Sequence, residues 1–176
     1  LSQHFVAVSE AVRVNLQQRY GIAAERISIV YGACEPRPQL PRDLALRRQL
    51  GIAECELMVC GCGTMDWRKG FDLFLQTAHE MVGQRQRTDI KFVWIGGAIS
   101  PETEVEYRYE IESLGLEAHL VLPGELPDPS LLFACADLFF LSSREDPFPL
   151  VMLEAARQGL PIVCFAGSGG AAEFVK

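Results

Sequence analysis

The chain has 176 residues, of which 49% are hydrophobic and 22% charged, and its formal net charge is −7. This length suffices for one α/β domain with a sizeable core and is too short for two such domains. The negative charge argues against nucleic-acid binding, which needs a basic face, and no apolar run reaches the length of a transmembrane span.

The first expected elements are a short apolar run from residue 5, a helix capped by Ser9, and a strand over Ile27–Tyr31. A serine hydroxyl before a helix can accept a hydrogen bond from a first-turn N–H group. A turn and a Pro-rich exposed linker follow. We therefore predict a crossover unit over residues 1–36 and the main domain over residues 37–176.

The main domain is predicted to open with an amphipathic helix over residues 40–50 and a core strand over residues 56–61. A glycine-rich loop then leads into a helix over residues 71–83. Glycines after a strand permit a tight turn and the close approach of a diphosphate. Lys69 stands at the helix entrance, where an ammonium can neutralise charge developing on a departing phosphate.

This loop also resembles half of a dinucleotide-binding fingerprint. Gly61-x-Gly63 lacks the third glycine, and the next strand, Ile90–Ile95, ends in Gly96-Gly97 rather than in an acid for a ribose. The sequence therefore disfavours NAD binding.

The next predicted elements are an acidic helix from residue 100 to about residue 114, a strand from His119, a Pro-rich loop, and a short helix over residues 131–136. The acids of the first helix form a solvated face. Strands that alternate with helices in this way predict a mostly parallel, Rossmann-like sheet with helices on both faces.

The most informative stretch is a strand–loop–helix–strand unit. A buried strand over residues 137–141 leads into a polar loop, Ser142–Pro149, and then into a helix that ends before Gly159. Pro161 blocks its continuation, and a strand follows to residue 165. Ligands of open α/β sheets bind at the carboxyl ends of strands, where this loop lies.

The side chains of this unit fit a nucleotide sugar. The first helical N–H groups, of Leu150 and Val151, have no intrahelical partner and favour a phosphate. Glu154 lies one turn deeper on the same face, where a carboxylate can accept two hydrogen bonds from a ribose diol. Glu145 and Asp146 can take hydroxyl groups beyond the phosphate. A diol, a phosphate and a second polyol in a row indicate a nucleoside-diphosphate sugar.

The run from residue 143 to residue 155 resembles the acidic donor-site signature of retaining GT-B glycosyltransferases of family 4 (group 1). That signature is two acids separated by seven residues around a Phe-x-Leu-Val core. With Glu154 as the second acid, the first falls on Asp146, where the family has glutamate; Pro149 replaces the usual glycine. Whether Asp146 or Glu145 touches the sugar stays open.

Further motifs of the chain are similar to those of this family. Lys69-Gly70 matches its pyrophosphate loop, but Gly63 or Thr64 stands where the family has arginine, and Arg68 is the substitute cation. The resemblance implies Lys69, Asp146 and Glu145 as catalytic residues. It implies donor contacts from Gly63, Thr64, Arg68, Gly97, Glu125, Leu126, Phe148, Pro149, Leu150, Val151, Glu154, Gly169 and Gly170. The last two belong to a Gly-Gly-x-x-Glu loop expected to aim amides at the cleft.

The resemblance implies the C-terminal, donor-binding half of a GT-B enzyme, truncated at its own C-terminus and without its N-terminal acceptor domain. The parent would transfer a hexose from a UDP- or GDP-sugar with retention, without a metal or cofactor, in polysaccharide biosynthesis. Membrane association of that parent is conceivable but is not encoded in this chain. The chain alone would bind its donor without turnover. Two alternatives stay open: a degenerate, non-catalytic GT-B-like scaffold, and one half of a nucleotide-sugar epimerase.

Six cysteines raise the question of a metal or of disulfides. Cys60 and Cys62 share one face of an expected strand, yet no C-x-x-C pair or nearby histidine accompanies them. Most of the cysteines sit in apolar runs. We therefore expect reduced, buried thiols, no metal site and a cytoplasmic location, and no signal peptide is recognisable.

Overall fold

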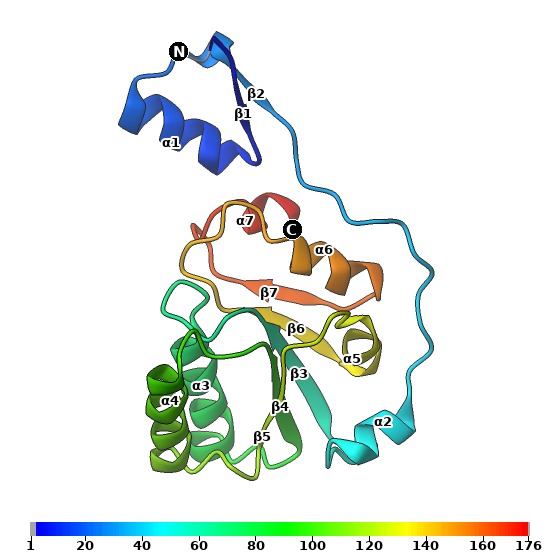
Figure 1. Ribbon diagram of the computed structural model, residues 1–176. Helices are drawn as coiled ribbons and strands as arrows, with labels where there is room; N and C mark the ends of the chain where they lie inside the picture. The colour runs from blue at the N-terminus through cyan, green and yellow to red at the C-terminus, as the bar shows by residue number, and fades with distance from the viewer. Residues whose placement is uncertain (1–2, 176) are drawn as a thin grey trace.

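The main body of the protein is a parallel β-sheet. A computed structural model describes residues 3–175, and within them five strands pair in the order β5-β4-β3-β6-β7, all parallel (Figure 1). The strands are β3 (Leu57–Cys62), β4 (Ile90–Ile95), β5 (Leu120–Gly124), β6 (Leu138–Leu141) and β7 (Ile162–Cys164). The predicted Rossmann-like α/β fold is thus confirmed.

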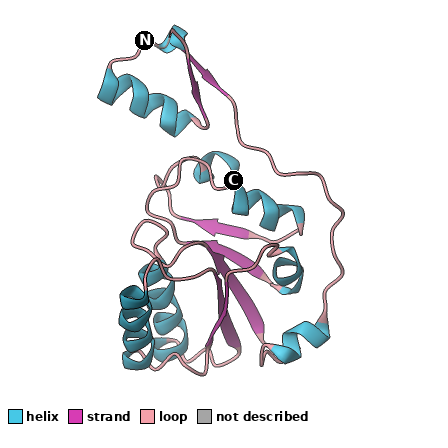
Figure 2. Ribbon diagram, in the orientation of Figure 1, coloured by secondary structure: helices cyan, strands magenta, loops and turns pink. Residues whose placement is uncertain are grey.

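Helices cover both faces of this sheet (Figure 2). One face carries α3 (Phe71–His79) and α4 (Pro101–Ser113); the other carries α2 (Leu44–Gln49), α5 (Ser130–Cys135) and α6 (Leu150–Arg157). Side chains alternate along each strand, so β6 sends Phe140 to the α3 side and Phe139 to the α6 side. Because both faces are buried, the strands read as continuous apolar runs.

The first part of the chain forms a separate small unit, which Figure 1 shows beside the end of α7 (Ala171–Phe174). It consists of β1 (Phe5–Ala7), α1 (Glu10–Tyr20), the short 3₁₀ turn η1 (Ala24–Arg26) and β2 (Ile27–Ile29), with the two strands parallel. The Ser9 hydroxyl accepts a hydrogen bond from Val12 N at 3.2 Å, as its predicted capping role requires. We call residues 3–31 the first unit.

Two predicted helix boundaries are wrong. The helix expected from residue 40 begins at Leu44, because the Asp43 carboxylate accepts hydrogen bonds from Ala45 N and Leu46 N and so caps the helix there. The helix expected over residues 71–83 is regular only to His79. It continues as a π-helical turn, η2 (Glu80–Gln84), which Arg85 N closes by donating to Glu80 O at 3.1 Å.

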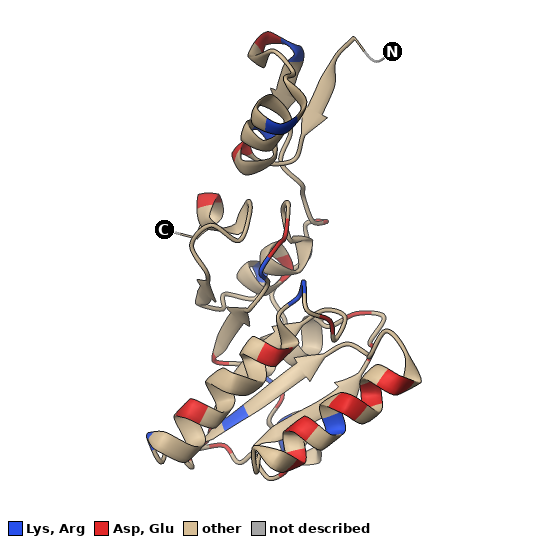
Figure 3. Cartoon of the chain, turned by 90° about the vertical axis from the view of Figure 1, so that its left-hand side faces the viewer, with Lys and Arg blue, Asp and Glu red and all other residues tan. Residues whose placement is uncertain are grey.

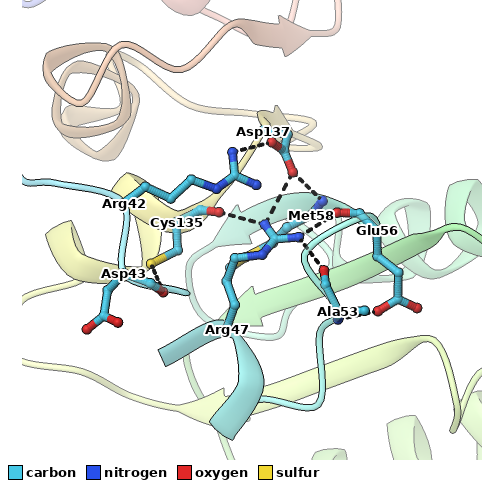
Figure 4. A network of polar contacts seen from close by, with 8 residues as sticks. All are labelled: Arg42, Asp43, Arg47, Ala53, Glu56, Met58, Cys135 and Asp137. Atoms are coloured by element: carbon cyan, nitrogen blue, oxygen red, sulfur yellow. Dashed lines mark hydrogen bonds and ion pairs between the residues drawn. The ribbon is translucent and has the colours of Figure 1, made fainter. Parts of the chain in front are cut away.

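A buried arginine anchors α2 beneath the sheet (Figure 4). Arg47 is fully buried, and its guanidinium donates to the carbonyl oxygens of Cys135, Ala53 and Glu56 at 2.8, 3.1 and 2.5 Å and to Asp137 Oδ2 at 3.3 Å. Asp137 also accepts from Met58 N at 2.8 Å. These contacts tie α2 to the starts of β3 and β6, at the edge of the sheet opposite the carboxyl ends of its strands.

Acidic side chains concentrate on α4 (Figure 3). The exposed members are Glu102, Glu104, Glu106 and Glu112. Glu104 pairs with Arg108 at 2.8 Å, and the others face solvent, as predicted for this helix. Within residues 3–175 no helix is long and apolar enough to cross a membrane.

Candidate functional site

Two loops meet at the carboxyl edge of the sheet. The loop between β3 and α3 ends at Lys69-Gly70, and the loop between β6 and α6 begins at Ser142, whose hydroxyl donates to Lys69 O at 3.1 Å. Gly70 has φ 68°, and a Cβ there would lie 2.1 Å from Ser142 O. Only glycine permits this approach. The fold therefore brings the predicted phosphate loop and the predicted acidic loop into direct contact.

Lys69 and Asp146 form an ion pair at the centre of this contact. Lys69 Nζ lies 2.5 Å from Asp146 Oδ2, and the two side chains are only 16% and 7% exposed. A Cβ at Gly63 would lie 3.1 Å from Lys69 Cγ and Cδ, so Gly63 packs along the lysine side chain. Lys69 therefore contacts two other predicted site residues, the catalytic Asp146 and the donor-binding Gly63.

Glu145, the other candidate acid, is exposed, and its main chain contacts a different residue. Its carbonyl oxygen accepts a hydrogen bond from the guanidinium of Arg68 at 3.3 Å. In the described part of the chain, neither Arg68 nor Thr64 reaches the Lys69–Asp146 pair through a side-chain hydrogen bond. Of the two acids left open by the sequence, Asp146 is the one beside Lys69.

Arg144 holds the acidic loop in place. Its guanidinium donates to both carboxylate oxygens of Asp72, at 2.7 and 2.6 Å, and lies 5.1 Å from the ring centroid of Trp67. The hydrogen bonds from Arg144 hold the pKa of Asp72 below its ordinary value, although partial burial opposes this. This bidentate pair fixes the loop to α3.

The loop leads into α6, whose first turn carries the predicted phosphate-binding amides. Pro149 has φ −73° and ψ 112°, and the helix begins at Leu150. The N–H groups of Leu150 and Val151 lie in the first turn, where no helical carbonyl oxygen stands four residues earlier to accept their hydrogen bonds. They are therefore available to a ligand.

Glu154 lies one turn farther along α6, beside a polar cavity of about 260 Å³. Leu150, Asp128, Arg157 and Arg37 also line this cavity. The Glu154 carboxylate accepts no hydrogen bond within residues 3–175, so its oxygens are free for a diol. The predicted ribose acid therefore lies next to the predicted phosphate site.

Other predicted donor residues lie apart from the ion pair. A Cβ at Gly97 would lie 3.2 Å from Glu125 Oε1, so these two residues pack together. Gly97 lines a different cavity, of about 450 Å³, between α4 and β5. Leu126 is 38% exposed. The structure brings Gly97 and Glu125 to each other and not to Lys69.

The Gly169-Gly170 turn supports the acidic loop from inside the protein. Gly170 N donates to the carbonyl oxygens of Asp146 and Pro147, both at 3.2 Å, and a Cβ at Gly169 would lie 1.9 Å from Asp146 O. The Gly170 amide is therefore already satisfied, whereas we expected the amides of this turn to face the cleft. The close approach of the acidic loop therefore explains why glycine stands at both positions.

The linker contributes to the cavity beside Glu154, which the sequence did not indicate. Arg157 of α6 donates to Glu35 O at 2.8 Å, and Arg37 pairs with Asp128 at 3.0 Å, so the linker forms one wall of the Glu154 cavity through Glu35 and Arg37. These partners are 91 to 122 residues apart in sequence, and no local pattern signals them.

The charges of Lys69 and Glu154 both act on the thiol of Cys62. Burial, with a further contribution from Glu154, raises the pKa of its thiol to about 11, and Lys69 opposes this rise. The alternation of β3 places Cys62 on the α6 side, a position that the sequence could have indicated. All six cysteines, which lie within the described residues, are free thiols. Residues 3–175 contain no group of three or more His, Cys, Asp or Glu side chains placed to hold a metal ion.

A parallel α/β domain with a lysine, a helix N-terminus and an acid at its carboxyl edge is typical of sugar-nucleotide transferases. The model of the family described as Glycosyl transferases group 1 matches residues 43–176, well over half of the chain, so the chain belongs to this family.

Individual relatives agree with this assignment. The chain is 31% identical over 150 residues to the alpha-galactosylglucosyldiacylglycerol synthase of Streptococcus pneumoniae, covering 81% of this chain and 38% of that protein. It is 27% identical to the D-inositol 3-phosphate glycosyltransferase of Rhodococcus jostii, covering 96% of this chain and 38% of that protein. The crystal structure of Anabaena Alr3699/HepE in complex with UDP and glucose superposes with a TM-score of 0.80 at 25% identity, covering all of this chain and 47% of that one. The chain thus spans less than half the length of these relatives.

Proposed function

We propose that this chain is the part of a glycosyltransferase that binds a nucleoside-diphosphate sugar. The observation that carries the proposal is the arrangement at the carboxyl edge of the sheet. Lys69 lies beside the loop that leads to α6, the first-turn amides of α6 follow that loop, and Glu154, which is one helical turn beyond Leu150, has no hydrogen-bond partner within residues 3–175. These three groups lie in the order in which a nucleoside-diphosphate sugar presents its parts. Lys69 faces the phosphate next to the sugar, the α6 amides face the diphosphate, and Glu154 faces the ribose.

Each group has a role in the proposed transfer. The diphosphate binds the amides of Leu150 and Val151, and Glu154 accepts hydrogen bonds from the ribose hydroxyls. When the bond between the anomeric carbon and the phosphate oxygen breaks, its electron pair leaves with the phosphate. Lys69 and the helix N-terminus stabilise that charge without a metal. Asp146 accepts hydrogen bonds from hydroxyl groups of the sugar. The acceptor oxygen bonds to the anomeric carbon with retention, and its hydroxyl proton passes to the departing phosphate.

The donor is proposed to be a UDP- or GDP-hexose. The complex of the Anabaena relative with UDP and glucose supports a uridine nucleotide. The cavity beside Glu154, with Asp128 and linker residues in its walls, offers the room next to the ribose that a base requires.

One test is calorimetric titration of the chain with UDP, GDP and ADP. We expect one nucleotide to bind selectively and Glu154→Ala to lose roughly tenfold to a hundredfold in affinity, the value of charge-assisted hydrogen bonds. Glu106→Ala, which removes an exposed acid of α4, serves as the matched control and should bind like the wild type.

A non-catalytic scaffold is the second candidate. Two observations favour it: no arginine stands at Gly63 or Thr64, and Lys69 is already paired with Asp146. A folded chain that binds none of the three nucleotides would support the scaffold and contradict the donor site.

We further propose that the parent enzyme binds its acceptor, in polysaccharide or related glycan synthesis, through a domain outside this chain. The chain alone should then bind the donor without transferring it. Incubation with the sugar nucleotide that fits the preferred base should release no sugar above the uncatalysed rate. Substantial hydrolysis would contradict this part of the proposal.

A further inference from the structure

The carboxylate of Glu173 joins two distant parts of the chain. Its Oε2 accepts a hydrogen bond from Glu10 N and its Oε1 accepts one from Ala11 N, both at 3.0 Å, in the first turn of α1. The Tyr31 hydroxyl donates to Oε2, also at 3.0 Å. One carboxylate therefore caps α1 and binds the end of the first unit at the same time.

These hydrogen bonds favour the charged carboxylate. Burial raises the pKa of Glu173, but the two amides and the Tyr31 hydroxyl outweigh burial and hold the pKa below its ordinary value. The same contact raises the pKa of Tyr31. At neutral pH the junction therefore consists of three charge-assisted hydrogen bonds, which are stronger than neutral ones.

The junction continues directly to the start of α6. The rings of Tyr31 and Phe148 lie 5.4 Å apart, and a Cβ at Gly32 would lie 2.6 Å from Leu150 Cδ2. On the other side, a Cβ at Gly170 would lie 2.7 Å from Ser9 Cβ and 2.9 Å from Phe148 Cδ2. Phe148 is thus enclosed between the first unit and the Gly170 turn, two residues before the first amide of α6.

We propose that Glu173 is a positioning residue: it fixes the first unit against Phe148 and thereby sets the position of the phosphate-binding amides of Leu150 and Val151. This inference rests on the proposed function. Glu173 itself touches no donor in this arrangement, because its oxygens are occupied by α1 and Tyr31. By linkage, a bound diphosphate strengthens the junction as much as the junction strengthens diphosphate binding.

The test compares Glu173→Ala, Glu173→Gln and the control Glu106→Ala in the 176-residue chain. Hydrogen exchange at the amides of Glu10 and Ala11 should accelerate in Glu173→Ala, since both lose their acceptor. The Kd for UDP should rise about tenfold, while the Kd for uridine, which has no phosphate, should stay unchanged. A merely structural loss would weaken both ligands alike.

Glu173→Gln keeps one carbonyl acceptor, so its amide exchange rates and its Kd for UDP should lie between those of the wild type and of Glu173→Ala. This second variant keeps the test valid if the alanine variant misfolds. Unchanged UDP affinity in Glu173→Ala, with faster amide exchange, would overturn the positioning role and leave Glu173 as a cap. Unchanged exchange would overturn the cap as well. A wild-type chain that binds no nucleotide would refute the positioning role together with the proposed function, so the two failures are distinguishable.

Discussion

Lys69 and Asp146 are both proposed to bind the donor, yet in this structure they neutralise each other at 2.5 Å. A diphosphate that recruits Lys69 must compete with Asp146 for the ammonium. Asp146→Asn removes this competition, so we expect the affinity for UDP to rise about fivefold, corresponding to ~1 kcal/mol for one ion pair. Titration with UDP measures this, and Glu145→Gln, at the exposed neighbouring acid, is the matched control.

The same substitution should act differently on the complete donor. The Asp146→Asn variant offers the sugar hydroxyls a neutral amide in place of a carboxylate, so we expect the gain for a UDP-sugar to be smaller than the gain for UDP. If Asp146→Asn weakens UDP binding, Lys69 needs its partner for orientation, and the competition argued above is wrong.

At the residue scale, the sequence indicated much of this site and missed its pairings. Residue types, spacing and the family resemblance predicted Lys69, Glu154 and one of Asp146 and Glu145 as donor-site residues, because a motif is a local pattern. The contact between Lys69 and Asp146 spans 77 residues and follows only from the order of β3 and β6 in the sheet. For the same reason the Gly170 amide appeared free in the sequence, although Asp146 O and Pro147 O lie opposite it.

At the scale of secondary-structure elements, α2 depends on one buried side chain. Removing the Arg47 guanidinium would break the hydrogen bonds that it donates to three carbonyl oxygens and to Asp137, which would keep its contacts with Arg42 and Met58 N (Figure 4). We expect Arg47→Ala to lower the free energy of unfolding by about 3–5 kcal/mol, as for other broken buried pairs. Arg48→Ala, at the exposed next position of the same helix, should change it by less than about 0.5 kcal/mol. Urea unfolding compares the two, and equal effects would show that the network does not anchor α2.

Asp137 should make part of this stability depend on pH. Burial raises its pKa, but hydrogen bonds from Arg42 and from Met58 N outweigh burial, so the pKa in the folded protein lies below its ordinary value. A lowered pKa contributes stability that is present above the unfolded-state pKa, about 4, and is lost as the pH falls through the folded-state pKa. Between about pH 7 and about pH 3 the wild type should therefore lose more unfolding free energy than Asp137→Asn. Equal losses of unfolding free energy in the two proteins would show that Asp137 does not cause this pH dependence.

Helix limits were predictable where a cap is local and unpredictable where it competes with another signal. Ser9 begins α1 as expected, whereas Pro41 suggested a start that the Asp43 cap overrides. No local pattern singled out Arg47, which the structure buries. Only the carbonyl groups at the starts of β3 and β6, which the fold assembles, make that burial favourable.

At the scale of the whole molecule, the two hydrophobic clusters that enclose the five-stranded sheet draw no residue from the first unit, within the described part of the chain. We therefore expect residues 32–176 to fold without the first unit, with a cooperative thermal transition within a few degrees of that of the whole chain. This shortened chain should show the weakened UDP binding expected of Glu173→Ala, because it lacks α1 and Tyr31.

A second truncation separates the linker from the first unit. Residues 37–176 also lack Glu35, whose carbonyl oxygen accepts from Arg157 at 2.8 Å, so this chain should melt below residues 32–176. Its Glu154 cavity also loses one wall, so its affinity for uridine should fall, whereas that of residues 32–176 should not. If residues 32–176 fail to unfold cooperatively, the first unit belongs to the folding core, and the predicted division near residue 36 is wrong. If residues 32–176 instead unfold cooperatively, bind uridine like the whole chain and bind UDP more weakly, the two segments have different roles in one site. The linker then shapes the nucleoside cavity. The first unit, through Glu173 and Phe148, positions the phosphate-binding helix.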